Sequence, residues 1–278
     1  MRNTVEKYGR WAVVTGGSAG IGLAFANQLA AAGHNLVLVS RNQTRLDRAE
    51  QSIRAKHRVE VKTLAADLTD EGALDRLYDF TRDLDVGMAI LNAGVETSGH
   101  YTKTSIEFHR GLVDLNVRVP MEMAHTFGER FVRRGRGGIV FVSSLFGYQG
   151  VPLVAGYSAS KAYILSLGEA LSVELKRFGV DVTVLSPGLT DTDMPAAMPI
   201  NFSRLPIPKM TPEKTARAGL RALGRKISVV PGLINNIYVW ENRLLPRSTP
   251  IRMFGWMVRM AFKKEQVPNF LITPAQVR

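Results

Sequence analysis

The chain has 278 residues, 45% of them hydrophobic, which is enough to bury a substantial core in one large domain or two small ones. It contains no cysteine, which excludes disulfides, thiolate nucleophiles and zinc–thiolate sites, and its five histidines show no metal-ligand spacing. The net charge of +12 is uneven, because residues 201–278 carry 14 Lys/Arg and 3 Asp/Glu, whereas residues 1–200 carry 22 and 21. An anionic partner such as a phosphorylated cofactor, a thioester carrier or a lipid surface would fit the C-terminal part.

Two absences bear on location. No apolar run approaches the roughly 18 residues that would read as a membrane-spanning helix. The N-terminal residues 1–10 run from a charged segment directly into an apolar one and show no secretory pattern. We therefore expect a cytoplasmic protein, with peripheral membrane association as the alternative.

Seven short runs rich in Val, Ile and Leu alternate with longer segments that have helical length and apolar spacing. This alternation predicts an α/β fold with a parallel sheet of about seven strands and helices on both faces. No linker divides the chain, so a single domain over residues 1–278 is expected. The predicted strands are 11–16, 34–41, 59–68, 86–94, 137–144, 180–188 and 227–232.

The first strand leads into TGGSAGIG (15–22), which opens a helix. Gly16, Gly20 and Gly22 would allow a tight turn and a close approach of the backbone to a pyrophosphate, which a helix N-terminus attracts. The alternative is a plain turn, because glycine-rich turns are common. The motif lacks the Lys-Ser/Thr ending of a P-loop, which disfavours nucleotide hydrolysis.

The end of the second strand indicates which dinucleotide would bind. A carboxylate there holds the ribose 2′-hydroxyl of NAD, whereas an arginine accommodates the 2′-phosphate of NADP. From His34 to Leu46 the sequence has no Asp or Glu, and it places Ser40 and Arg41 at the strand end. NADP(H) is therefore favoured over NAD(H). The alternative is that Arg41 is only a solvated loop residue.

Tyr157 and Lys161 are four residues apart in a predicted helix, so they lie on the same face. Taken alone, the pair has an ordinary explanation, with the phenol packed in the core and the ammonium in water. A charged amine beside a phenol would also make the phenol more acidic, by an upper limit of about three pKa units.

Taken together, these motifs resemble the compact, single-domain type of the short-chain dehydrogenase/reductase family over about residues 10–232. The glycine turn is similar to the family motif TGxxxGxG, residues 92–94 to its NAG motif, and residues 157–161 to its YxxxK pair. Position 19 is Ala, where many NADP-using members have a basic residue. The resemblance implies a Rossmann-type doubly wound sheet.

The resemblance also implies roles for individual residues. Tyr157 would be the general acid/base, Lys161 would lower the pKa of Tyr157 and bind the nicotinamide ribose, and Ser144 would donate to the substrate oxygen. Asn116 would hold, through its backbone carbonyl, a water that connects Lys161 to solvent. Besides Tyr157 and Lys161, the expected cofactor-binding residues are Gly16, Ser18, Gly20, Ile21, Gly22, Ser40, Arg41, Asp67, Leu68, Asn92, Ala93, Gly94, Pro187, Gly188 and Thr192.

Several of these assignments have alternatives. Ser143 competes with Ser144, and Asn116 could be a helix-interior amide that is satisfied locally. Asp67, which in the family bonds the adenine amino group, could instead cap a helix that starts near Thr69. Thr192 could cap a turn.

The C-terminal third carries the expected substrate elements. Residues 189–210 contain four Pro and three Met and are predicted to be a lid over an apolar ligand. Thr211 and Pro212 begin a helix. A helical extension over 233–278 would hold helices at 233–245 and 250–264, and the basic, Met-rich second helix would pack on the domain or a partner subunit. Docking of residues 250–264 on a membrane surface is the alternative.

We therefore expect an NADP(H)-dependent oxidoreductase that acts on a carbonyl or the CH–OH group of a secondary alcohol, with a lipophilic substrate. A 3-oxoacyl thioester is the narrower hypothesis. The alternatives are a non-catalytic NADP-binding sensor or scaffold, and a peripheral membrane protein. A homo-oligomer is expected, without a metal or a nucleic-acid partner.

Overall fold

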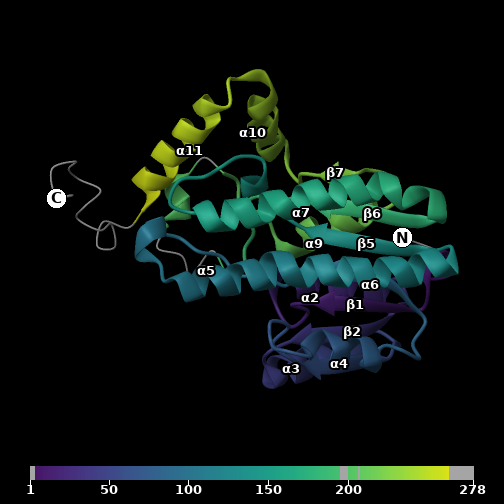
Figure 1. The fold of residues 1–278 in the computed structure, drawn as a ribbon. Helices are drawn as coiled ribbons and strands as arrows, with labels where there is room; N and C mark the ends of the chain where they lie inside the picture. The colour runs from purple at the N-terminus through teal and green to yellow at the C-terminus, as the bar shows by residue number, and fades with distance from the viewer. Residues whose placement is uncertain (1–3, 195–199, 206, 263–278) are drawn as a thin grey trace.

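A seven-stranded parallel sheet forms the centre of the molecule in a computed structural model that describes residues 4–194, 200–205 and 207–262. The strand order is β3-β2-β1-β4-β5-β6-β7 (Figure 1), which confirms the predicted Rossmann-type sheet. The strands span Trp11–Thr15 (β1), Asn35–Ser40 (β2), Val61–Ala65 (β3), Val86–Leu91 (β4), Gly137–Val142 (β5), Val180–Leu185 (β6) and Ser228–Val229 (β7).

Helices cover both faces because successive strand side chains point to opposite sides. Val14 and Leu38 pack with α2, α3 and α9, whereas their neighbours Val13 and Val37 pack with α4, α6 and α7. The helices on the first face are Gly20–Ala31 (α2), Gln43–Lys56 (α3) and Pro212–Ala222 (α9), and those on the second are Ala73–Phe80 (α4), Val119–Arg134 (α6) and Ala155–Glu174 (α7). Thr211 caps α9 as predicted, its side chain accepting from the Lys214 N–H.

Every strand is shorter than predicted, and of the polar residues expected at the strand ends only Thr15 and Ser40 lie inside a strand. The third strand stops at Ala65 because the chain then turns, and the carboxylate of Asp67 accepts hydrogen bonds from the backbone and the hydroxyl of Thr69. The alternative that Asp67 caps a helix near Thr69 is therefore wrong, and its predicted contact with the adenine stays a prediction. Helix α4 begins only at Ala73, after Gly72 adopts a left-handed conformation with φ of 69°.

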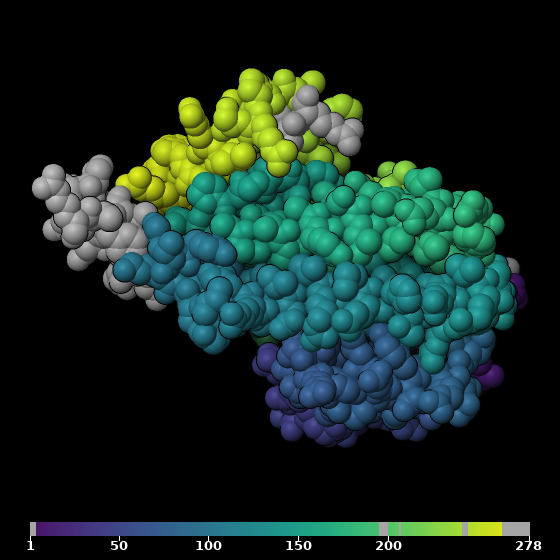
Figure 2. Space-filling model, in the orientation of Figure 1, coloured from purple at the N-terminus to yellow at the C-terminus, as the bar shows by residue number. Residues whose placement is uncertain are grey.

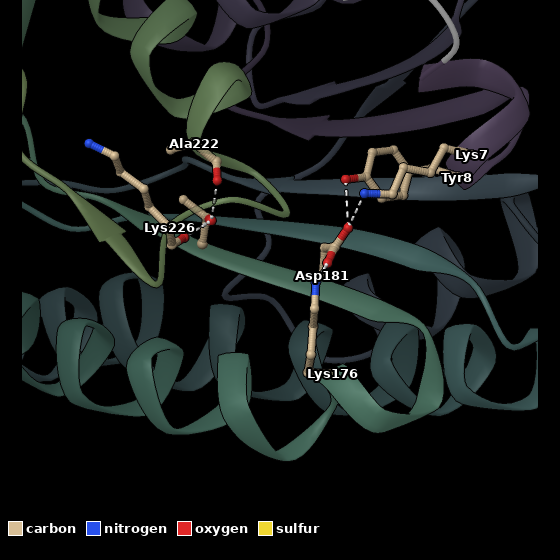
Figure 3. A network of polar contacts seen from close by, with 7 residues as sticks. Lys7, Tyr8, Lys176, Asp181, Ala222 and Lys226 are labelled. Atoms are coloured by element: carbon tan, nitrogen blue, oxygen red, sulfur yellow. Dashed lines mark hydrogen bonds and ion pairs between the residues drawn. The ribbon is translucent and has the colours of Figure 1, made fainter.

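An ion cluster around the buried Asp181 ties the first described helix to the sheet at the amino end of β6. Lys7 and Tyr8, from helix α1 (Thr4–Tyr8), donate to one carboxylate oxygen of Asp181 at 2.5 and 2.9 Å, and Lys176 donates to the other at 2.5 Å (Figure 3). Burial raises the pKa of Asp181, but the hydrogen bonds from Lys176, Lys7 and Tyr8 outweigh it and hold that pKa below its usual value. Asp181 is therefore an anion in the folded state at neutral pH.

Two helices beyond β7, Leu233–Leu244 (α10) and Ser248–Ala261 (α11), project above the helical layer (Figure 1). Phe254 and Val258 of α11 are buried against Phe146 and Ile207, so one face of this helix packs on the domain as expected. The helix starts two residues earlier and ends three residues earlier than predicted; Lys263 and Lys264 lie outside the described residues.

The described connections also hold helix α5 at Ile106–Val113 and 3₁₀ turns at Tyr101–Lys103, Leu145–Gly147, Lys176–Phe178 and Phe202–Arg204. In the predicted lid, Thr190 pairs with Met210 and Ile200 with Phe262, while residues 195–199 and 206 lie outside the described part. Within the described ranges, no helix is long and apolar enough to cross a membrane.

Candidate active site

The predicted site residues gather at the carboxyl ends of the strands. The sheet order reverses between β1 and β4, since the chain runs outward to β2 and β3 on one side and to β5, β6 and β7 on the other. A crevice at such a switch point is where open α/β sheets bind ligands. The glycine turn follows β1 and the NAG segment follows β4, so the two lie on either side of this point.

Three positions of the glycine turn do not tolerate a side chain. Gly16 and Gly20 have φ of 65° and 53°, a region that favours glycine. A Cβ on Gly22 would lie 2.2 Å from the Gly16 carbonyl oxygen, so the first turn of α2 sits directly on the loop. Ala19, the residue before α2, makes no side-chain cap hydrogen bond. The turn therefore presents a helix N-terminus to a phosphate.

The NAG segment is fixed to the glycine turn by Thr15, which sequence reasoning did not single out. The Thr15 hydroxyl accepts from the backbone N–H groups of Asn92 and Ala93, both at 3.0 Å, and the Asn92 amide donates to the Thr15 carbonyl at 2.9 Å. Gly94 lies beside the Asn116 amide and the Lys161 ammonium, because an added Cβ would come within 3.0 and 3.4 Å of them.

At the end of β2, the donors expected for a 2′-phosphate lie together. The Ser18 hydroxyl donates to the Ser40 hydroxyl at 2.9 Å, and Arg41 approaches the Asp67 carboxylate at 3.5 Å with a side chain that is 68% exposed. The hydrogen bonds from Thr69 and the charge of Arg41 hold the pKa of Asp67 low despite its burial. Leu68 is buried in the core cluster on the α4, α6 and α7 side of the sheet, whereas Ile21 is half-buried against the cluster on the α2, α3 and α9 side.

Asn116 is buried in a π-helical turn, Asp114–Arg118, between α5 and α6. Its amide oxygen accepts from the Val95 N–H at 2.9 Å, and its amide nitrogen donates to the Val95 carbonyl at 2.7 Å and to Ser160 at 3.1 Å. The amide therefore joins the loop after β4 to α7, which excludes the local, helix-interior alternative. Single π turns occur often at functional sites.

Tyr157 and Lys161 share one face of α7 as predicted. Lys161 is buried, its ammonium donates to the Val142 carbonyl at 2.9 Å, and it lies 5.7 Å from the centre of the Tyr157 ring. Ser143 and Ser144 make different contacts. Ser143 is buried and donates to the Lys161 carbonyl at 2.7 Å, whereas Ser144 lines a cavity and hydrogen bonds with Tyr157.

Burial, and not the lysine, dominates the acidity of this pair. Burial raises the pKa of Tyr157 to about 12, against the lowering effect of the Ser144 hydrogen bond, and the Glu96 carboxylate raises it further. Burial also lowers the pKa of Lys161 to about 8. The expected lowering of the Tyr157 pKa by Lys161 is therefore not found, because removing both groups from water disfavours the charged form of each.

The cavity beside Tyr157 is apolar apart from three side chains. Its volume is about 80 Å³, and its polar groups are Glu96, Ser144 and Tyr157. Pro187 and Gly188 close one side, and its apolar side chains are Leu145, Phe146, Leu189, Met194, Phe202 and Ile207. Four of these side chains come from the segment 189–210, and its role as a lid stays a prediction.

Glu96 was missed by sequence reasoning. Burial raises the pKa of its carboxyl to about 7, and one of its oxygens is buried without a hydrogen-bond partner among the described residues. The only signal in the sequence is its position two residues after the NAG motif. It places a titratable group in the apolar cavity, next to the phenol.

The loop after β6 brings the last predicted residues to the site. The Leu145 N–H donates to the Pro187 carbonyl at 2.8 Å, which joins this loop to the segment that carries Ser144. Gly188 packs against the side chain of Asn235 from α10, where an added Cβ would clash at 2.6 Å. Thr192 lies against Gly20, its methyl group 3.0 Å from the position of a Cβ there. The loop thus reaches the glycine turn.

These features fit a dinucleotide. The glycine turn offers close backbone approach and a helix N-terminus, Arg41, Ser18 and Ser40 offer donors at the β2 end, and Lys161 lies beside Gly94 at the inner end. In the described ranges, no group of three or more His, Cys, Asp or Glu side chains could hold a metal ion.

Comparisons with known proteins agree with this geometry. The family model for short chain dehydrogenases matches residues 10–200. The chain is 31% identical over 255 residues to 7beta-hydroxysteroid dehydrogenase of Clostridium sardiniense, covering 92% of this chain and 98% of that relative. It is 32% identical over 220 residues to very-long-chain 3-oxoacyl-CoA reductase-B of Danio rerio, covering 78% of this chain and 69% of that relative.

Solved structures are similar over nearly the whole chain. One from a study of 7beta-hydroxysteroid dehydrogenase stereoselectivity has a TM-score of 0.83 and 31% identity, covering 91% of this chain and 99% of its own. A short-chain dehydrogenase from Sphingobium yanoikuyae in complex with NADPH has a TM-score of 0.76 and 27% identity, covering 94% and 99%. The chain therefore belongs to the short-chain dehydrogenase family, and it is an oxidoreductase of the kind that uses a nicotinamide cofactor.

Proposed function

We propose that this protein is an NADP(H)-dependent carbonyl reductase or secondary-alcohol dehydrogenase for a lipophilic substrate. The observation that carries the proposal is the pairing of Ser144 and Tyr157 in a cavity that is apolar apart from these two side chains and Glu96, with Lys161 buried beside Tyr157. An apolar cavity selects a hydrophobic body, and the two hydroxyls supply hydrogen bonds for one oxygen atom.

Catalysis by the chain itself is acid–base chemistry at that oxygen. A bound nicotinamide cofactor supplies the hydride in reduction and accepts it in oxidation. As the carbonyl carbon gains hydride, the electrons of its π bond move to oxygen, and the Tyr157 hydroxyl donates the proton that makes the alcohol. A phenol with a pKa of about 12 is neutral at pH 7, which is the state that reduction requires.

Ser144 and Lys161 assist this transfer. The Ser144 hydroxyl donates to the same substrate oxygen and stabilises its developing negative charge. With a pKa of about 8, Lys161 is mostly protonated at pH 7. Its ammonium lies beside Gly94, where it would donate hydrogen bonds to the nicotinamide ribose and so position the cofactor. In the oxidation direction the roles reverse, and Tyr157 takes the proton from the alcohol.

The preference for NADP(H) rests on Arg41. The β2 end carries Ser40 and Arg41 and no carboxylate that would hold a 2′-hydroxyl, and the Arg41 side chain is largely exposed for a phosphate. Replacing Arg41 by Ala should raise the KM for NADPH by about 10- to 100-fold, the value of a charge-assisted hydrogen bond. The KM for NADH should change little. Equal losses for both cofactors would contradict the preference.

Two classes of lipophilic ketone are candidate substrates. A rigid ring ketone of steroid type is supported by the apolar lining and by similarity to 7beta-hydroxysteroid dehydrogenases over nearly their whole length. A 3-oxoacyl thioester is supported by the similarity to a very-long-chain 3-oxoacyl-CoA reductase and by the basic C-terminal part. Rates of NADPH consumption with 7-oxosteroids, 3-oxoacyl-CoA and simple cyclic ketones rank them, and a thioester no faster than the cyclic ketones removes the second class.

The decisive experiment is Tyr157→Phe. It removes one hydroxyl and should lower kcat by about 10²- to 10⁴-fold, the usual value of general acid catalysis. Tyr163→Phe, on the same helix at an exposed position, is the matched control and should keep full activity. NADPH binding, measured by fluorescence, should survive in both variants. Unchanged turnover of Tyr157→Phe would overturn the mechanism, and a wild type that binds NADPH but reduces no ketone would favour a sensor or scaffold.

A further inference from the structure

Helices α10 and α11 form a hairpin whose outer surface is unusually apolar for a surface helix pair. Leu233, Ile237, Trp240 and Leu244 recur at helical spacing along α10, and all four are exposed, by 81, 52, 59 and 77%. We call these four residues the apolar stripe. An amphipathic helix on a soluble surface normally turns such a stripe inward. Here the inward side of α10 carries the buried Asn235 and the ring of Tyr238, which packs on Phe254, and the apolar stripe faces outward.

The turn between the two helices continues this surface. Leu244, Leu245, Pro246 and Arg247 are consecutive and all exposed, so the tip of the hairpin is hydrophobic with a cation beside it. In the space-filling view the hairpin stands out from the rest of the molecule (Figure 2). The tip is therefore free to meet a flat surface without interference from the sheet domain.

Tryptophan placement supports an interfacial role. The chain has three Trp residues; Trp11 is 6% exposed, whereas Trp240 and Trp256 are 59 and 64% exposed. Trp is seldom left this exposed unless it contacts something, and it is favoured where one side is apolar and the other wet. Both exposed Trp residues lie on the hairpin, one on each helix.

The charged residues of the hairpin indicate an anionic partner. From Leu233 to Phe262 the sequence has four arginines and a single acidic residue, and none of residues 244–262 is acidic. Arg247 and Arg252 are exposed among the apolar side chains. Two copies joined through this face would bring arginines against arginines, which costs free energy. An anionic phospholipid surface offers both an apolar layer and negative charge.

We propose that the α10–α11 hairpin docks the protein on membranes that contain anionic phospholipid, with the apolar stripe and the hairpin tip inserted at the headgroup boundary. Arg247 and Arg252, both exposed, contact lipid phosphates. The sheet domain stays in water, because no described helix can span the bilayer. The docking segment is thus α10 and the tip, and only the outer residues of the sequence-predicted segment 250–264 take part.

Vesicle binding by the full chain tests this proposal. Vesicles of phosphatidylglycerol with phosphatidylcholine should co-sediment the protein and shift its Trp emission to shorter wavelength, whereas phosphatidylcholine alone should do neither. Because Trp11 is buried, the shift reports the hairpin, and Trp240→Phe should reduce it. Raising salt to about 0.5 M should weaken binding, since the Debye length falls to a few ångströms.

Variants locate the contact. The triple variant Leu233→Ser/Ile237→Ser/Trp240→Ser should lose at least tenfold in vesicle affinity, and Arg247→Gln/Arg252→Gln about fivefold for each arginine. Val173→Ser on α7, with 66% exposure, and Arg58→Gln after α3 are matched surface controls and should bind like the wild type.

Three outcomes would overturn the proposal. One is the absence of binding and of any Trp shift in the wild type, which needs no variant to fold. Another is equal affinity for neutral and anionic vesicles. The last is a change in molecular mass in solution caused by the triple stripe variant, together with no vesicle binding by the wild type. This result would mean that the apolar stripe forms an interface between two copies of the chain.

Discussion

Glu96 offers the sharpest test of the site, because burial alone raises the pKa of its carboxyl. Its pKa rises from 4.5 to about 7 in the folded protein. At 1.36 kcal/mol per unit, this difference corresponds to about 3 kcal/mol. Below pH 4.5 the carboxyl is protonated in both the folded and unfolded states. Between pH 4.5 and 7 only the unfolded state ionises, so the free energy of unfolding falls by about 3 kcal/mol as pH rises.

Glu96→Gln removes the titration and keeps the shape. The variant should therefore gain about 3 kcal/mol in stability relative to the wild type between pH 4.5 and about pH 8. Urea denaturation of both proteins across this range measures the gap directly. A gap that stays constant to within about 1 kcal/mol would refute the reasoning, because it would mean that the carboxyl ionises freely in the folded protein.

Three other predictions follow from described contacts. Gly22→Ala should raise the dinucleotide Kd at least tenfold, because its Cβ would lie 2.2 Å from the Gly16 carbonyl, whereas Gly111→Ala, with open space around it, should bind normally in the same titration. Asp181→Asn should cost about 1–3 kcal/mol of unfolding free energy at pH 7, and the loss should shrink below pH 3.8 as the wild-type carboxylate is protonated; an unchanged midpoint in urea at pH 7 would contradict this. Burial lowers the pKa of His34 from 6.5 to about 4, so the free energy of unfolding should fall by about 3 kcal/mol as pH falls from 6.5 to 4. His34→Gln should abolish this dependence on pH. If the dependence persists in the variant, it belongs to another group.

The effects of His34 and Glu96 on the pH dependence of stability have opposite signs. Between pH 4.5 and 6.5, falling pH stabilises the protein through Glu96 and destabilises it through His34, by similar amounts. The wild type should therefore look almost insensitive to pH in this range, and each variant should expose the slope of the other group.

The sheet and the glycine turn could be predicted because their signals are local. A run of β-branched residues followed by glycines specifies its own conformation, and parallel strands then bring all such ends to one edge. The separation of Tyr157 and Lys161 by one helical turn is equally local. These residues could be placed without knowledge of what surrounds them.

The rest depends on contacts between distant residues. The pKa of Tyr157 rises because the pair is buried, and burial was not visible in its spacing. The clusters around Asp181 and Asn116 join segments that are far apart in the chain, Lys7 with Asp181 and Val95 with Asn116. Glu96 belongs to no motif. The face of α11 that packs inward could not be chosen either, since both of its faces carry apolar residues.

The position of the ion cluster at Asp181 bears on how the protein can evolve or be engineered. Asp181 lies at the amino end of β6, whereas Pro187 and Gly188 follow the carboxyl end of the same strand. A single strand thus anchors the chain terminus at one rim and shapes the ligand loop at the other. Changes to the anchoring rim can adjust robustness to heat or denaturant while ligand selection, decided at the opposite rim, is left free to diverge.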